Sequence, residues 1–323
     1  MLRRTLLAFT AAGLSAPSVL RAQEAAWPER PVKLIVPWPP GGAVSTVANA
    51  FVPKLAEALG KPVAIEHRGG ASGSVDATEA ARAAPDGYTW MLAYDTEATN
   101  QTVMRLPYRV MQAFTPTTLV ATGPLVLTAH QSTPWRSFQD VVAAAKAAPD
   151  TISYATSGIG GLAHIATTLL QELGGFRLTH TPFRGGGPAT QAAAAGEVPL
   201  YMTSLVNVGQ HIRAGTLRPL AVTTEGGSRH LPGVKSFAQQ GFAGFEAPTW
   251  WLLLGRAGTP DAVVRGMHEA LSRVLSTPEV RGRIEENGAD VVAGGPERAR
   301  RFLNSEVQKW GRVIRDNNIT AES

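Results

Sequence analysis

Apolar and polar positions alternate in two blocks along the chain, and each block predicts strands followed by helices. In the first block we expect strands over 31–38, 61–68 and 88–95 and helices over 44–59 and 74–84. In the second block we expect strands over 151–157, 177–183 and 198–205 and helices over 137–148, 162–173 and 188–196. Such alternation is typical of parallel βαβ units, so the expected fold class is α/β.

Two further apolar runs, 124–131 and 248–257, do not fit the simple alternation. We predict that both are strands that cross between two lobes. Lobe one then contains residues 27–124 plus 248–323, and lobe two contains residues 125–247. A chain that crosses twice favours a hinged pair of lobes with a ligand cleft between them.

Residues 1–22 have the features of a signal peptide: a basic start, an apolar run, and small residues up to Ala22. Arg3 and Arg4 also suggest a twin-arginine export signal. Removing this segment, which includes Arg21, lowers the net charge from +5 to +2, so there is no reason to expect a nucleic-acid partner. The chain has no cysteine, which excludes disulfides and cysteine-bound metals. An exported two-lobed protein of this composition fits a bacterial periplasm.

Uncharged, glycine-rich turns connect three of the expected strands to their helices. The stretch "VPWPPGGAVSTVANAF" at 36–51 leaves a strand and enters a helix with no charged residue at the junction. The junctions at 154–166 and 181–192 are also rich in glycine. Ligands of open α/β sheets bind beyond the carboxyl ends of the strands, where free helix N–H groups and the helix dipole favour an anion. Three such turns, distributed over both lobes, predict a shared anion-binding cleft.

The order and spacing of several motifs resemble one family of transport receptors. The motifs are "WPERPVKLIVPWPPGG", "APDGYTWML", "LPY" at 106–108, "SGIGGLAH", "HTPFRGGGPA" and "AGTP" near 257. From Trp27 to about Trp310 the chain is similar to the Bug family, the periplasmic solute receptors of tripartite tricarboxylate transporters. The resemblance implies a type II periplasmic binding protein fold that closes on a small carboxylate and delivers it to a membrane permease. It also implies that the loop at 40–45 and the helix start at 157–164 hold a ligand carboxylate, partly through ordered water.

The candidate ligand-binding residues lie at the ends of expected strands and at the starts of helices. They are Trp38, Pro40, Gly41, Gly42, Ala43, Val44, Ser45, Tyr94, Asp95, Thr96, Ser157, Gly158, Gly160, Gly161, His164, Arg184, Gly185, Thr203 and Ser204. Four of them have structural alternatives: Trp38 can pack between the lobes, Asp95 can form an Asx turn, His164 can cap a helix or pack in the core, and Arg184 can form a surface ion pair.

Acidic residues are missing at three positions where the family often has them. This chain has Ser45, Ala192 and Thr203 there. A buried ammonium group without a negative partner costs several kcal/mol, so we expect a carboxylate ligand without an amine. Asp95 is the counter-argument, because an aspartate in the cleft can hold an amine by itself.

A non-catalytic receptor is the leading interpretation, and two other classes stay open. "GIGGLA" at 158–163 matches a dinucleotide-binding pattern, but the acidic residue expected about 20 positions later is absent. The sequence has no G-x-S-x-G, P-loop or H-E-x-x-H motif, and its histidines include no i, i+4 pair. An exported hydrolase- or oxidoreductase-like enzyme is therefore the second interpretation, and a ligand-sensing adaptor for a signalling partner is the third. We expect a monomer with no cofactor and no metal.

Overall fold

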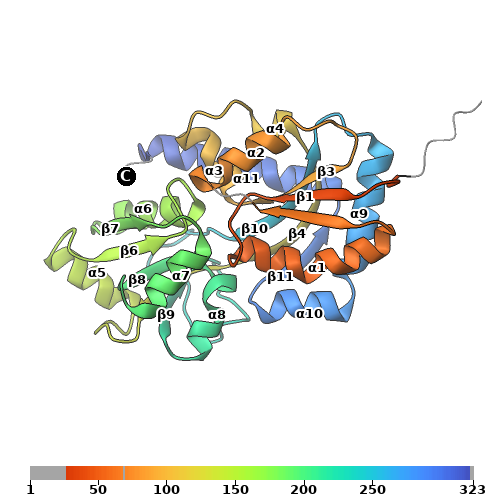
Figure 1. Ribbon diagram of the computed structural model, residues 1–323. Helices are drawn as coiled ribbons and strands as arrows, with labels where there is room; N and C mark the ends of the chain where they lie inside the picture. Colours follow the sequence, from red (N-terminus) through yellow and green to blue (C-terminus); the bar gives the residue numbers. More distant parts are fainter. Residues whose placement is uncertain (1–26, 68–69, 321–323) are drawn as a thin grey trace, which may run out of the picture.

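The computed structural model describes residues 27–67 and 70–320, which form two lobes, each built on one β-sheet (Figure 1). The segment 1–22, predicted to be a signal peptide, lies outside the described residues. Within the described ranges, no helix is both long enough and apolar enough to cross a membrane.

The first sheet has six strands in the order β11-β4-β10-β3-β1-β2. They are β1 Val32–Val36, β2 Val63–His67, β3 Thr89–Tyr94, β4 Phe114–Gly123, β10 Thr249–Arg256 and β11 Asp290–Gly294. β1 pairs in parallel with β2 and β3, whereas β10 runs antiparallel to β3 and β4. The parallel half brings the carboxyl ends of β1 and β3 to the same edge of the sheet.

The second sheet has five strands in the order β7-β6-β8-β5-β9. They are β5 Leu125–His130, β6 Ser153–Thr156, β7 Thr179–Pro182, β8 Leu200–Ser204 and β9 Leu217–Val222. β6 is parallel to β7 and β8, and β5 is antiparallel to β8 and β9. The predicted α/β class is confirmed, although both sheets are mixed because the crossing strands β5 and β10 run against their neighbours.

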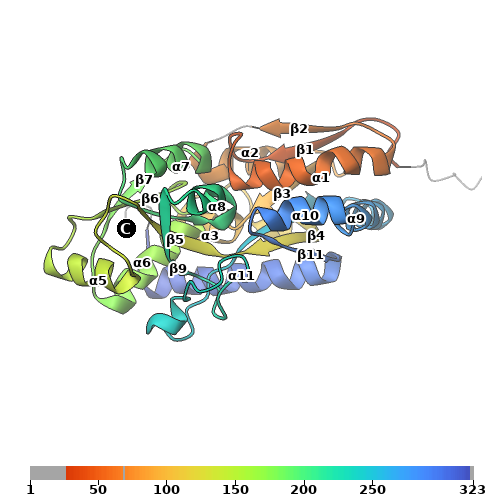
Figure 2. The ribbon, with the colours of Figure 1, turned by 90° about the horizontal axis from the view of Figure 1, so that it is seen from below.

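Helices cover both faces of the six-stranded sheet and the faces of the five-stranded sheet (Figure 2). In lobe one they are α1 Ala43–Leu59, α2 Ser74–Ala80, α3 Thr96–Val103, α4 Val110–Ala113, α9 Asp261–Leu275, α10 Pro278–Glu286 and α11 Pro296–Asp316. In lobe two they are α5 Phe138–Ala147, α6 Leu162–Gly174, α7 Gly186–Ala195 and α8 Leu205–Arg213. Successive strand residues serve opposite faces: Leu34 packs in the cluster with α1 and α9, and Ile35 packs in the cluster with α2 and α11.

The chain crosses between the sheets twice, as the two unmatched apolar runs predicted. β4 continues into β5 through Pro124, and the return crossing leads through Ala247 into β10. The Thr223 hydroxyl joins the two crossings, because it donates to the Ala247 carbonyl (2.7 Å) and accepts from the Leu125 N–H (2.9 Å). The two connections therefore run side by side, which is the arrangement of a hinge.

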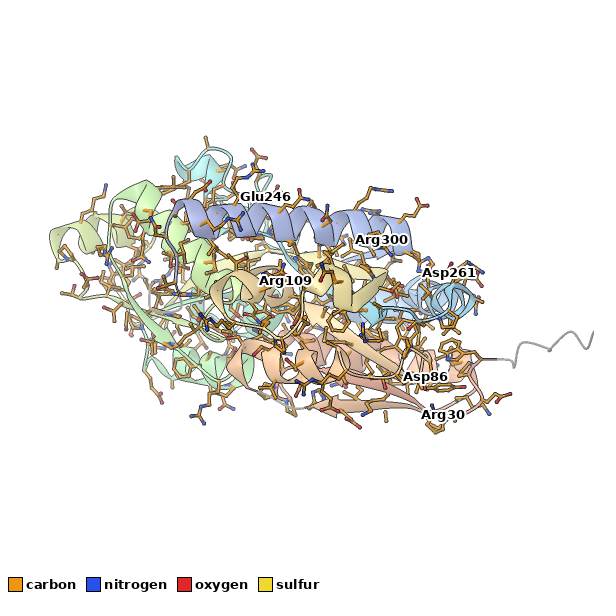
Figure 3. All side chains as sticks on the ribbon, turned by 90° about the horizontal axis from the view of Figure 1, so that it is seen from above. Arg30, Asp86, Arg109, Glu246, Asp261 and Arg300 are labelled. Carbon is orange, nitrogen blue, oxygen red and sulfur yellow. The ribbon has the colours of Figure 1, made fainter. Side chains whose placement is uncertain are left out.

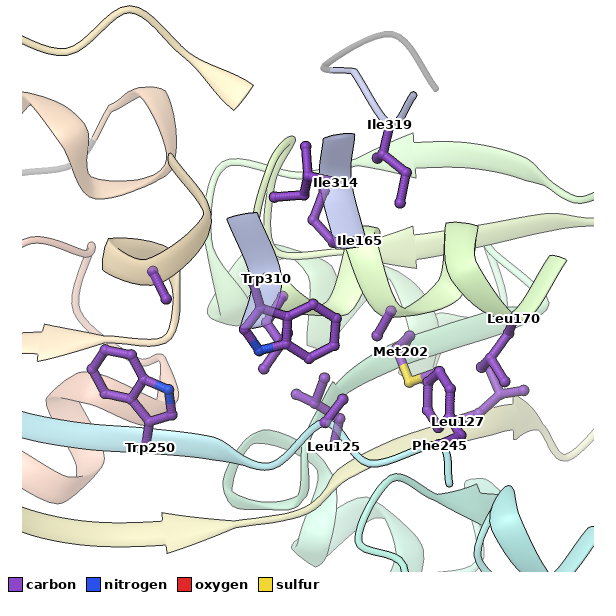
Figure 4. Packing of buried hydrophobic residues seen from close by; sticks show 14 of the residues in the cluster. Leu125, Leu127, Ile165, Leu170, Met202, Phe245, Trp250, Trp310, Ile314 and Ile319 are labelled. Carbon is purple, nitrogen blue, oxygen red and sulfur yellow. The ribbon is translucent and has the colours of Figure 1, made fainter. Parts of the chain in front are cut away.

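Helix α11 makes a further connection between the lobes. It packs against β4 and α3 of lobe one. Glu246 of the return crossing lies beside α11 (Figure 3), and Lys309 donates to the Glu246 carbonyl (2.6 Å). Beyond that point, Trp310, Ile314 and Ile319 share one buried cluster with Ile165 and Leu170 of α6 (Figure 4). The end of the chain, which the sequence assigned to lobe one, thus also contacts lobe two.

Candidate functional site

Two small adjoining cavities lie between the lobes and share Trp38, Tyr94 and Ser157; we call them together the chamber. The chamber is lined by Trp38, Gly42, Ala43, Val44, Tyr94, Asp95, Thr96, Leu125, Ser157, Gly158, Gly161, Leu162, Ala163, Gly186, Thr203, Ser204 and Asn207. Each cavity has a volume of about 20 Å³, room for about one water molecule. A larger ligand can therefore enter only when the lobes move apart.

Five helices begin at the chamber. Its lining includes the first residues of α1, α3, α6 and α7 and the N-cap of α8, and these helices come from both lobes. The N-caps of α1, α6 and α7 are the glycines 42, 161 and 185, and none of the three helices has a side-chain cap or an acidic residue in its first turn. Their positive dipole ends, and the first-turn N–H groups that have no partner within the helix, make the chamber favourable for an anion.

The starts of α1 and α7 touch across the gap between the lobes. A methyl group at Gly42 would lie 3.7 Å from the Gly186 nitrogen, which is ordinary van der Waals contact. Gly185, before α7, has a φ of 113°, a conformation that residues with a side chain rarely adopt. Glycine at these two positions thus lets two helix N-termini from different lobes come together.

Two buried polar groups in the chamber have no hydrogen-bond partner within the described ranges: Trp38 Nε1 and Asn207 Oδ1. The Asn207 Nδ2 group donates to the Thr203 hydroxyl (2.8 Å). Tyr94, in contrast, is engaged, because its hydroxyl bonds to the side chains of Thr249 and Ser204. Unpaired buried polar groups are costly, so Trp38 and Asn207 are positioned to meet a polar ligand.

Asp95 is the one acidic residue among the chamber's described lining residues, and it is buried. Its Oδ2 accepts a hydrogen bond from the Thr249 hydroxyl (2.5 Å), and the backbone N–H groups of Leu162 and Thr96 also bond to the carboxylate. Burial raises the pKa of Asp95 to about 7, although these hydrogen bonds oppose the shift. Asp95 thus connects lobe one to the start of α6 in lobe two.

Most of the predicted site residues line the chamber, and the others lie around it. Those in the chamber are Trp38, Gly42, Ala43, Val44, Tyr94, Asp95, Thr96, Ser157, Gly158, Gly161, Thr203 and Ser204. Pro40, Gly41, Ser45, Gly160, His164, Arg184 and Gly185 are outside its lining. Ser45 is turned away, since its hydroxyl bonds to the Pro39 carbonyl (3.3 Å).

Arg184 lies in a second, wider cavity outside the chamber. This outer cavity has a volume of about 790 Å³ and also contacts Trp38, Ser157 and Gly158. The Arg184 side chain is exposed there. Arg184 thus lines a cavity that adjoins the chamber at Trp38, Ser157 and Gly158, and no lysine or arginine is among the described residues that line the chamber itself.

His164 lies behind the α6 entrance loop. It is fully buried, its Nδ1 accepts the Gly160 N–H (3.2 Å), and its ring stacks on His180 with 4.1 Å between centroids. Burial, and secondarily His164, lower the pKa of His180 to about 3, so that ring is neutral. The two rings pack behind the loop at 157–161. His164 therefore occupies a core position, which is one of the alternatives considered for it from the sequence.

Two hydroxyl groups of lobe one donate hydrogen bonds to the loop at 157–161 of lobe two. Ser72 Oγ donates to the Ile159 carbonyl (2.5 Å), and the buried Thr99 Oγ1 donates to the Gly160 carbonyl (2.6 Å). These bonds join the two lobes, so they exist only while the lobes are in contact. They stabilise the closed arrangement specifically.

Replacing Thr99 by valine is expected to weaken ligand binding about tenfold, because closing then leaves the Gly160 carbonyl without its donor, a cost of about 1–3 kcal/mol. Titration calorimetry with the bound acid measures this effect. Thr117→Val is the matched control, since the Thr117 hydroxyl bonds to the Thr115 carbonyl within lobe one (3.1 Å). Equal affinity of Thr99→Val and the wild type would contradict a role for this bond in closure.

Two α/β lobes joined by paired crossings, with helix N-termini gathered between them, define a solute-binding protein of the periplasmic type. The chain belongs to the tripartite tricarboxylate transporter receptor family, whose model matches residues 47–319. Members of this family are solute-binding receptors, which confirms the leading interpretation over the enzyme alternative. In the described residues, no group of three or more His, Cys, Asp or Glu side chains is arranged to hold a metal ion.

Known relatives cover nearly the whole chain. Protein BugT of Bordetella pertussis is 31% identical over 308 residues, which cover 94% of this chain and 93% of BugT. An R. palustris protein solved with adipate has a TM-score of 0.87 at 30% identity, over 91% of this chain and 99% of that one. MatC of Rhodopseudomonas palustris, solved with bound malate, has a TM-score of 0.84 at 29% identity, over 89% of this chain and 100% of MatC.

Sequence reasoning missed several lining residues, notably Asn207, Gly186 and Leu162. Gly186 and Leu162 directly follow predicted positions, and a helix N-terminus offers several consecutive N–H groups, so the site includes the next residue. Asn207 lies in the first turn of α8, whose start after β8 contains no glycine. The signal that pointed to the other junctions was absent there.

Proposed function

We propose that this protein is a periplasmic receptor that binds a small organic carboxylate in the chamber, closes on it, and presents it to a membrane permease. The observation that carries the proposal is the meeting of five helix N-termini, three without side-chain caps, around a space lined by no basic side chain within the described ranges. Backbone N–H groups can bind a carboxylate without a full positive charge. The adipate and malate held by two structural relatives have this chemistry.

The proposed ligand carries no ammonium group. Asp95 is the one candidate partner for an amine among the chamber's described lining residues, and its carboxylate already receives hydrogen bonds from Thr249, Leu162 and Thr96. An amine would have to replace these donors in a closed space. Export through the segment 1–22 and delivery to a tripartite transporter permease complete the proposal.

Titration calorimetry with malate, adipate, succinate and benzoate tests the proposal. We expect at least one of these acids to bind with a Kd in the micromolar range, which requires about 8 kcal/mol. Mass spectrometry of the same mixture should recover the acid unchanged. Absence of binding by every acid, or conversion of the acid into product, would contradict the proposed function.

A further inference from the structure

Asp95 and an anionic ligand must share the same closed space. The Asp95 carboxylate lies at the carboxyl end of β3, lines the chamber, and is only 2% exposed. It accepts hydrogen bonds from β10 through Thr249 and from the start of α6 through Leu162. Asp95 therefore occupies one of the helix N-termini that would otherwise face the ligand.

The charged groups around Asp95 do not neutralise it. On α11 the buried Glu306 raises the pKa of Asp95 further, and the neighbouring Tyr94 carries no charge, because burial and Asp95 itself raise the pKa of its hydroxyl well above the usual value. The groups that face Asp95 from β10 and α6 are a hydroxyl and a backbone N–H. No lysine or arginine is among the described residues of the chamber lining. The carboxylate of Asp95 is thus balanced by dipoles alone.

We infer that Asp95 takes up a proton from solvent when a carboxylate enters the chamber, so that the receptor binds its ligand together with one proton. This inference rests on the proposed function. Two carboxylates in one desolvated space repel each other, and the lower-energy state has one of them protonated. Protonated Asp95 keeps one oxygen to accept the Leu162 N–H, while its new O–H can donate to the Thr249 hydroxyl or to the ligand.

Proton uptake makes the affinity depend on pH in one direction. Asp95 carries a proton in the complex that it lacks in the free protein above its pKa there, so binding becomes weaker as the pH rises. Burial in the closed arrangement raises the pKa of Asp95 to about 7, and a second carboxylate beside it raises the pKa further. Because Asp95 is less buried when the lobes are apart, the Kd should rise at least tenfold between pH 6 and pH 8.

The test is titration calorimetry at pH 6, 7 and 8, with malate or the acid that bound best, at constant ionic strength. At each pH, two buffers with different ionisation enthalpies give the number of protons taken up. We expect close to one proton per ligand at pH 8 and a Kd at least tenfold weaker at pH 8 than at pH 6. Uptake near zero at pH 8 would overturn the inference and leave the proposed function intact, whereas no binding of any acid at any pH would contradict both.

Asp95→Asn is the matched variant, because asparagine keeps the shape and can still accept the Leu162 N–H. It should bind the acid at pH 8 at least as tightly as the wild type does at pH 6, with no proton uptake and little dependence on pH. A pH dependence in Asp95→Asn equal to that of the wild type would overturn the inference. The wild-type proton count stands by itself if the variant does not fold.

A comparison of aspartate with succinate tests the alternative that Asp95 binds the amine of a ligand. If Asp95 binds an amine, aspartate should bind at least tenfold more tightly than succinate, without proton uptake, and Asp95→Asn should remove the difference. That result would overturn the inference. We expect succinate to bind more tightly than aspartate.

Discussion

Asn207→Asp is expected to abolish carboxylate binding while leaving the fold intact. The substitution keeps the size of the side chain but places a negative charge in the chamber, where Asn207 has an unpaired buried oxygen. Two unit charges 4 Å apart at an effective dielectric constant of 20 repel by about 4 kcal/mol, which corresponds to a loss of several hundred-fold. The Asn207 amide donates to the Thr203 hydroxyl; in the variant this hydroxyl can donate to the new carboxylate instead, and an acid in the first turn of α8 favours the helix.

Two further variants make the Asn207 test specific. Asn304→Asp introduces the same charge on the exposed side of α11 and should leave the Kd unchanged. Asn207→Ala removes the amide without adding charge, and we expect a loss of about tenfold, the scale of one or two hydrogen bonds. Calorimetry at pH 8 measures all three. Binding by Asn207→Asp within fivefold of the wild type would show that the ligand carboxylate is held elsewhere.

Gly42→Leu is expected to reduce affinity at least 100-fold by preventing the lobes from closing. A side chain longer than one carbon at this position would overlap the first turn of α7, because even a methyl group already contacts the Gly186 nitrogen at 3.7 Å. Gly42 has φ and ψ of −98° and 176°, which any residue can adopt, so lobe one should fold normally. Replacing the N-cap glycine by leucine lowers the free energy of unfolding by about 1 kcal/mol at most.

Gly42→Ala is the control for this variant. Its methyl group fits at the observed separation, and we expect a Kd within threefold of the wild type. Small-angle scattering with saturating acid should show a larger radius of gyration for Gly42→Leu than for Gly42→Ala. Equal radii and equal affinities would mean that the starts of α1 and α7 do not need to meet for binding.

Local sequence chemistry was sufficient to predict the glycine turns that form the chamber. Gly42 and Gly161 end a strand-to-helix junction with no charged neighbour, and both became N-caps at the chamber. That inference needs only the strand, the turn and the helix that follow one another in the chain. It works because parallel strands bring such junctions to one edge of a sheet.

Features that depend on pairing between distant strands could not be predicted in this way. β9 contains Pro219 and was missed, because a proline argues against a strand; it is tolerated at the edge of the sheet, next to a register shift in β5. For His164 the sequence left a ligand role and a core role open; in the structure Tyr154 pairs with His180 across β6 and β7, and His180 in turn stacks on His164. Arg184 has the charge for a carboxylate, yet it lines the outer cavity and is exposed, which its place in a glycine-rich loop could not reveal.

The position of α11 limits how the protein can move. The helix packs against β4 in lobe one, and Trp310, Ile314 and Ile319 share a buried cluster with residues of α6 in lobe two, so α11 adds a third connection to the two strand crossings. Sliding or twisting of one lobe over the other would break the apolar contacts of Trp310 and Ile314. Three connections leave fewer relative movements open to the lobes than two strands alone would, so the search for the closed state costs less entropy.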